Sequence, residues 1–286
     1  MVWLVLDQNN KNVRRKGRIT YFMPKHATPF MTLALDIGNS NITVGLYAQN
    51  TWQHIWRLPT KVDSEAALFY QMRLSHCLME YGIAAGDIQQ VVISTVVPDL
   101  KATFVDLSQH LFHRAPVVVA PEIYSKLRLN IERPEELGTD LFANAVAAHY
   151  LYGRDCIVVD FGTALTFTSI DRNGELLGVA IAPGLKTSIS ALFQKTAQLP
   201  EVPLELPGSA IGKNTVHAIQ AGVLMGYVGL VRHLLQELKS ELGQQYIAVA
   251  TGGLSSILRP LQDEFHAIEP HLTLDGLRII GEEVNK

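Results

Sequence analysis

The chain has 286 residues, of which 48% are hydrophobic and 18% charged, with a net charge of −3. This composition excludes disordered, collagen-like and low-complexity proteins, and two cysteines provide neither a disulfide framework nor a cysteine-rich metal site. No stretch reaches the roughly 18 uninterrupted apolar residues of a membrane span, and the length corresponds to about two domains. We therefore expect a soluble, cytoplasmic protein of two domains with no membrane partner.

The first 30 residues differ from the rest of the chain in charge. They carry six Lys or Arg side chains and one Asp, a net charge of +5, which leaves −8 for residues 31–286. Because residues 31–286 are this acidic, they repel the phosphates of nucleic acids, and we expect no nucleic acid partner. The basic segment has three interpretations: a flexible tail, a targeting segment, or sequence upstream of a true start at Met31. We favour a dispensable, poorly ordered extension, because a secretory signal places basic residues before its apolar core and here the order is reversed.

Residues 31–150 are expected to form the first α/β domain. Runs of apolar and β-branched residues between turn formers predict strands over 33–36, 42–47, 51–58, 91–97 and 115–120. Apolar residues at helical spacing predict helices over 64–81, with Ser64 as N-cap, over 98–113 and over 138–152. The charged segment between the last strand and the last helix, residues 122–137, is expected to be irregular.

Residues 151–286 repeat the order of the first half. Strands are predicted over 157–160, 165–170, 175–181 and 246–250, with a two-residue hairpin turn at Asn173-Gly174. Helices are predicted over 185–196, 214–242 and 254–261. LALDIG around Asp36 and VVDFG around Asp160 share one layout of apolar strand, aspartate, apolar residue, glycine and polar turn. Two similar halves that face each other would form a cleft between them.

Both aspartate-glycine turns have the residue types of a phosphate site. An aspartate at a strand end can hold a hydrated Mg²⁺, and a glycine lets a phosphate approach backbone N–H groups. Short donors follow in each turn, namely Asn39, Ser40 and Asn41 in the first and Thr163 in the second. An ordinary hairpin uses the same residues, but two copies at matching places favour a phosphate site. Thr251-Gly252-Gly253 is a weaker candidate to seat a base or ribose.

Asp140 lies at the start of the helix predicted over 138–152, directly after PEELGT. It is either a first-turn acid that interacts favourably with the helix dipole or a general base that takes a proton from an attacking hydroxyl. Phosphoryl transfer mostly needs positioning and charge neutralisation, with one carboxylate to orient the nucleophile. P-loop, dinucleotide-binding and G-x-S-x-G motifs are missing from the sequence, and its histidines lack metal-ligand spacing.

In this order, the motifs resemble those of type III pantothenate kinases, members of the acetate/sugar kinase–Hsp70–actin superfamily. The resemblance extends from Met31 to the C-terminus and rests on eight segments: DIGNSN from Asp36, PEELGTD ending at Asp140, ANAVAA from Ala143, DFGTA from Asp160, APGL from Ala182, TAQLP from Thr196, IGKNT ending at Thr215 and TGGL from Thr251. It implies two duplicated ribonuclease H-like (actin-like ATPase) lobes, residues 31–150 and 151–286, with a cleft between the lobes.

The resemblance also implies an activity: ATP-dependent phosphorylation of pantothenate to 4'-phosphopantothenate, the first step of coenzyme A biosynthesis, by a homodimer. ATP with Mg²⁺ would be held by Asp36, Ile37, Gly38, Asn39, Ser40, Asn41, Ile42, Thr43 and Thr163. Pantothenate would contact Gly138, Thr139, Asp140, Leu141, Ile131 and Thr215. Asp140 would be the catalytic base, and Asp160 would bind the monovalent cation, K⁺ or NH₄⁺, that the family requires.

Three positions depart from the family pattern. Leu141 stands where an arginine usually follows the catalytic aspartate, Ile131 replaces a frequent tyrosine, and Thr168 replaces a common acid. The lost guanidinium would have been a bidentate clamp for an anion, and Lys126, Arg128 and Arg133 are candidates to supply the missing charge. The departure at Leu141 also supports the alternative hypothesis, a catalytically weak nucleotide-binding regulatory homologue. A different small-molecule kinase of the superfamily is a third hypothesis.

Overall fold

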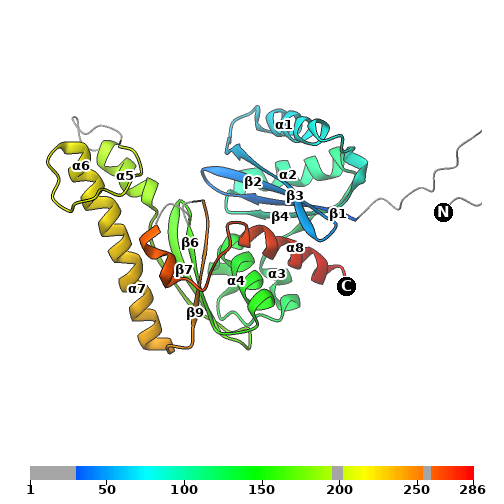
Figure 1. Cartoon of the computed structure of the whole chain (residues 1–286). Coiled ribbons are helices and arrows are strands. Elements are labelled where there is room, and N and C mark those ends of the chain that lie inside the picture. Colours follow the sequence, from blue (N-terminus) through cyan, green and yellow to red (C-terminus); the bar gives the residue numbers. More distant parts are fainter. Residues whose placement is uncertain (1–29, 195–201, 254–258) are drawn as a thin grey trace, which may run out of the picture.

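A computed structural model describes residues 30–194, 202–253 and 259–286 (Figure 1). The basic segment before Phe30, the TAQLP motif and the first part of the helix predicted over 254–261 lie outside the described residues. Within the described residues, one helix, Thr215–Leu242, is long and apolar enough to cross a membrane by length and composition. In its most apolar window, 39% of the residues are buried. Its buried side chains, which include Tyr227, Val231 and Leu235, pack in the core of the second half of the molecule.

The described residues form two five-stranded sheets with one strand order. The first sheet has the order β3-β2-β1-β4-β5 and consists of β1 (Met31–Ile37), β2 (Asn41–Ala48), β3 (Thr51–Pro59), β4 (Ile88–Thr95) and β5 (Val117–Val118). The second has the order β10-β9-β6-β7-β8 and consists of β6 (Cys156–Phe161), β7 (Ala164–Ile170), β8 (Leu176–Pro183), β9 (Ile247–Thr251) and β10 (Ala267–Ile268). In each sheet the first three strands are antiparallel and the others run parallel to the first. The duplicated ribonuclease H-like architecture is therefore confirmed.

Each sheet has one face toward its own helices and one face toward the other sheet. In the first sheet, Leu33, Leu35 and Ile37 pack against α1 (Ala66–Glu80) and α2 (Pro98–Leu111), while Ala34 belongs to a central core. In the second sheet, the alternate residues of β6 pack against α5 (Leu185–Gln194) and α7 (Gly226–Leu242). Because side chains alternate along a strand, Asp36 and Asp160 lie on the inner faces, which are turned toward the space between the sheets.

Two helices fill the space between the sheets, α4 (Thr139–Tyr152) and α8 (Leu272–Val284), as Figure 1 shows. Their core includes residues from both sheets, such as Ala34 of β1 and Val158 of β6. Gly276 of α8 lies against the carbonyl of Ala143 in α4 with no room for a Cβ. The small residues of the ANAVAA motif thus permit close helix packing, and this packing holds the two halves together.

Several local predictions need correction. Ser64 is not a helix cap, because α1 begins at Ala66 and the Oδ1 atom of Asp63 accepts a hydrogen bond from the Glu65 N–H just before it. The turn at Asn173-Gly174 is a three-residue loop, closed by the bond from Asp171 N–H to the Glu175 carbonyl. The helix predicted over 214–242 is present as α6 (Thr215–Gln220) and α7, joined by a π-helical turn, Ala221–Met225.

Short helical turns lie in the connections between these elements. The segment predicted to be irregular contains α3 (Pro121–Tyr124) and 3₁₀ turns at Ser125–Leu127 and Pro134–Glu136. Further 3₁₀ turns lie at Ala85–Asp87 and Arg259–Glu264. The helix α8 was not predicted at all.

Candidate active site

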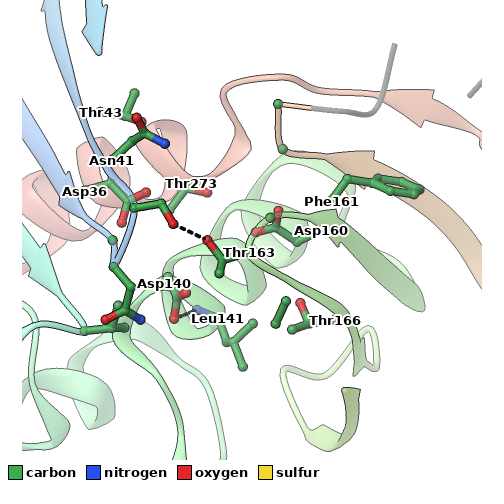
Figure 2. A pocket seen from close by; sticks show the side chains of 18 of the residues that line it. Asp36, Asn41, Thr43, Asp140, Leu141, Asp160, Phe161, Thr163, Thr166 and Thr273 are labelled. Carbon is green, nitrogen blue, oxygen red and sulfur yellow. Dashed lines mark hydrogen bonds between the residues drawn. The ribbon is translucent and has the colours of Figure 1, made fainter. Parts of the chain in front are cut away.

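The two aspartate-glycine turns are each closed by a hydrogen bond from the glycine N–H, and the first turn is one residue longer than the second. Gly38 N–H donates to the carbonyl of Asn41 over 3.1 Å, and Gly162 N–H donates to the carbonyl of Ala164 over 3.1 Å. The turns face each other, with the Oγ of Ser40 only 3.1 Å from the Oγ1 of Thr163 (Figure 2). The sequence echo is therefore a structural duplication, and it places two sets of polar groups on opposite sides of one gap.

The gap is a cleft of about 390 Å³ at the carboxyl ends of the parallel strands, where ligands bind in open α/β sheets. Asp36 from β1, Asp140 from α4 and Asp160 from β6 all line it (Figure 2). Residues predicted for the nucleotide also line it, namely Gly38, Asn39, Ser40, Asn41, Thr43 and Thr163, and so does Leu141. Three acids that are far apart in the sequence thus converge on one cavity.

The other predicted site residues do not line the cleft. Ile37 and Ile42 are fully buried in the core beneath the first turn. Gly138 and Thr139 lie at the start of α4, where the Thr139 hydroxyl donates to the carbonyl of Thr95 over 3.1 Å. Ile131 packs against the central core, and Thr215 is exposed at the start of α6.

The three carboxylates repel one another. Burial, followed by the charges of Asp140 and Asp160, raises the pKa of Asp36 from 3.8 to about 8, although Arg57 opposes this rise. Burial and the charge of Asp140 raise the pKa of Asp160 to about 6, against a hydrogen bond from Asn144. Burial also raises the pKa of Asp140. A cleft that contains unneutralised, desolvated acids favours bound cations.

Asp140 occupies the first turn of α4, after the N-cap Gly138. Its Oδ1 accepts a hydrogen bond from the Leu141 N–H over 2.9 Å. A Cβ at position 138 would lie only 2.6 Å from that oxygen, so glycine leaves the room that the carboxylate occupies. Asp140 is thus a first-turn acid, and the same placement points its carboxylate into the cleft, so the two interpretations of this residue are compatible.

Asp160 is held by two residues that sequence analysis missed. The Nδ2 of Asn144 donates to its Oδ2 over 2.9 Å, and the Oγ1 of Thr273 donates to the Oδ1 of Asn144 over 2.8 Å. Gly252 has φ +88°, and a Cβ there would lie 2.5 Å from the Oδ1 of Asp160. The one available signal was Asn144 itself, a buried polar side chain within an otherwise apolar helix segment.

The positive charge in the cleft comes from residues that were not predicted. Arg57 and Lys186 line it, together with His271, whereas Lys126, Arg128 and Arg133 do not. Thr166 also lines the cleft, is only 8% exposed, and its hydroxyl has no hydrogen-bond partner in the described part of the chain. An orphaned buried hydroxyl in a polar cleft fits contact with a bound ligand.

The donor set fits Mg²⁺ bound together with phosphate. Among the described residues, no group of three or more His, Cys, Asp or Glu is placed to hold a metal ion by protein ligands alone. Mg²⁺ typically keeps several waters and is bound through one or two carboxylates plus substrate phosphates. Asp36, beside the first phosphate turn, provides such a carboxylate.

The family model and the curated relatives agree on one family. A family model described as type III pantothenate kinase matches residues 32–237. A type III pantothenate kinase from Thermomicrobium roseum is 41% identical over 256 residues, which cover 90% of this chain and 98% of that protein. One from Dehalococcoides mccartyi is 40% identical over 258 residues, with the same coverage. A crystal structure described as a Baf family transcriptional activator from Campylobacter jejuni has a TM-score of 0.55 at 19% identity, covering 88% of this chain and 98% of that one, and shows the same fold.

Proposed function

Because this chain belongs to the type III pantothenate kinase family and uses ATP to phosphorylate pantothenate in coenzyme A biosynthesis, we propose that Asp36, Asp140 and Asp160 perform separate tasks in that reaction. The observation that supports this division is their convergence from β1, α4 and β6 on one cleft. Because each aspartate belongs to a different element, the three carboxylates enter the cleft from three separate parts of the fold.

Asp140 is the general base. Its carboxylate accepts the proton of the primary hydroxyl of pantothenate, while the hydroxyl oxygen forms a bond to the γ-phosphorus of ATP and the bond to the ADP oxygen breaks. Burial raises the pKa of Asp140, which makes the ionised form a stronger base than a solvated aspartate. Leu141 N–H holds one carboxylate oxygen in place.

The two turns hold the nucleotide. Gly38, Asn39, Ser40, Asn41 and Thr43 bind phosphate oxygens from the first lobe, with Ser40 opposite Thr163 of the second lobe. Asp36 would hold Mg²⁺, which would neutralise the phosphate charge. Asp160 binds the monovalent cation, K⁺ or NH₄⁺: its Oδ2 accepts a hydrogen bond from Asn144, its Oδ1 faces Gly252, and a cation would offset the burial and the charge of Asp140 that raise its pKa.

The enzyme acts as a cytoplasmic homodimer in this proposal. Thr215, which the family resemblance places at the pantothenate site, is exposed on α6 and does not line the cleft of its own chain. Exposed apolar residues lie nearby in the sequence and on the edge strand β8, with Ile211 75% and Ile181 68% exposed. A second copy on this face would cover these side chains and bring a Thr215 toward a neighbouring site.

Steady-state kinetics with pantothenate and Mg·ATP, with and without K⁺, test the assignment. Asp140→Asn should lower kcat by about 10²- to 10⁴-fold, the usual contribution of a general base. Nucleotide binding should persist, because the substitution retains the oxygen that Leu141 N–H contacts. Asp106→Asn, on the exposed surface of α2, is the matched control. Turnover near that of the wild type in Asp140→Asn would contradict the role of this residue.

The alternative of a regulatory homologue has no support from the relatives, which are named as kinases. It would still explain a wild-type protein that binds nucleotide and does not turn over pantothenate. The same assay therefore separates the two hypotheses.

A further inference from the structure

Arg57 lies on the inner face of the first sheet, beside the first phosphate turn. It is the cross-strand partner of Thr43, which in turn pairs with Asp36. Cross-strand partners present their side chains on the same face, and all three residues line the cleft. The guanidinium is therefore anchored on an edge strand next to the residues proposed to hold ATP.

The guanidinium reaches across the cleft to the second lobe. A Cβ on Gly253, directly after β9, would lie 2.8 Å from Nη1 and 3.2 Å from Nη2 of Arg57. A side chain at position 253 would displace the end of the arginine from this position. This is the Gly-Gly segment that sequence analysis considered as a seat for the nucleoside, so Arg57 lies between the phosphate turn of one lobe and the nucleoside segment of the other.

The charge of Arg57 is not matched by a partner. Within residues 30–194, 202–253 and 259–286 its guanidinium forms no ion pair or hydrogen bond, although three carboxylates share the cleft. Its charge acts on the cleft nevertheless, because it lowers the pKa of Asp36 and that of His271. A planar guanidinium has five donors in a rigid fork that matches phosphate oxygens.

We propose that Arg57 binds phosphate oxygens of ATP, extending from the first lobe over Gly253 of the second. This inference rests on the proposed function and adds a residue to its nucleotide site. Arg57 does not replace the guanidinium lost at Leu141, because its neighbours are Thr43, Asp36 and Gly253 rather than the first turn of α4.

The test compares Arg57→Gln and Arg57→Lys with wild type in the full-length protein. Isothermal titration with Mg²⁺ and a non-hydrolysable ATP analogue gives Kd, and steady-state assays give separate KM values for ATP and pantothenate. Arg57→Gln should weaken binding of the analogue by about 10- to 100-fold, the usual effect of losing hydrogen bonds from a charged group. The KM for pantothenate should stay the same. The affinity of Arg57→Lys for the analogue should lie between those of wild type and Arg57→Gln, since an ammonium keeps the charge without the forked set of donors.

Arg154→Gln is the matched control, because Arg154 is also exposed and lies just before β6, at the opposite end of that strand from Asp160. Unchanged analogue affinity in Arg57→Gln would overturn the proposal. An increase confined to the KM of pantothenate would instead assign Arg57 to the acid substrate, and equal weakening for both substrates would make it a contact between lobes. If wild type fails to turn over pantothenate, the proposed function is refuted, while the titration still decides the role of Arg57.

Discussion

Asp36→Asn should make the ligand-free protein more stable while it removes activity. Burial, Asp140 and Asp160 raise the pKa of Asp36 from 3.8 to about 8. At ~1.4 kcal/mol per pKa unit, the ionised side chain destabilises the native state by at most ~6 kcal/mol. Asp36 is only partly buried, and relaxation of water in the cleft reduces the expected gain for Asn to roughly 3 kcal/mol.

The gain in stability of Asp36→Asn over wild type increases with pH. Between about pH 4 and pH 8 the native state keeps a proton on Asp36 that the unfolded chain has released, so the stability of the wild type falls as pH rises. Asparagine has no such dependence. The difference in stability between variant and wild type should therefore be small near pH 4, widen up to pH 8 and stay constant above it.

Thermal melts in EDTA across this pH range measure the effect. For a chain of this size, roughly 3 kcal/mol corresponds to a rise in Tm of about 6–12 °C at high pH. Asp106→Asn, an exposed carboxylate on α2, is the control, and its Tm should follow that of the wild type. If Asp36→Asn melts below wild type at high pH, a favourable contact holds this carboxylate and the argument from repulsion is wrong.

Two further substitutions test the pantothenate site and the core. Leu141→Arg restores the guanidinium typical of the family on the cleft wall and should lower the KM for pantothenate about tenfold; an unchanged KM would mean that another group already binds the carboxylate. Gly276→Ala should destabilise the protein by about 1–3 kcal/mol in urea unfolding, because a Cβ would overlap the carbonyl of Ala143 in α4. Gly229→Ala, on the exposed side of α7 where an added methyl group would meet open space, should instead be neutral or stabilising.

The sequence predicted the duplicated strands because their signals are local. Apolar runs ending in Asp-x-Gly define β1 and β6, and both turns formed where the polar residues predicted them. The helix α8 was missed because Gly276 and Gly281 interrupt its apolar pattern and suggest a turn. Both glycines serve tertiary packing, since a Cβ would collide with Ala143 at the first and with Val92 and Gln90 at the second.

The site was predictable where one residue type at one place defines the chemistry. Asp36 and Asp160 end strands and Asp140 begins a helix, so their positions follow from local structure. Thr273 and Arg57 could not be found in this way, and Asn144 gave only the signal of a polar residue in an apolar helix, because their relation to the site depends on how α8 packs against α4 and how β3 faces the second lobe. The bond between Thr273 and Asn144, for example, joins residues 129 positions apart.

The duplication itself explains why this cleft favours cations. A repeated strand with an aspartate at the same position places one carboxylate on each inner face, and two sheets that face each other bring these like charges into one cavity. Asp140 adds a third negative charge from the helix between them, and its partial burial weakens screening by water. The neutralising positive charge must then come from bound ligands or from a basic side chain that lines the cleft, such as Arg57. An arrangement that destabilises the empty protein therefore favours the metal-bound nucleotide over the free one, since the metal relieves the repulsion that the fold creates.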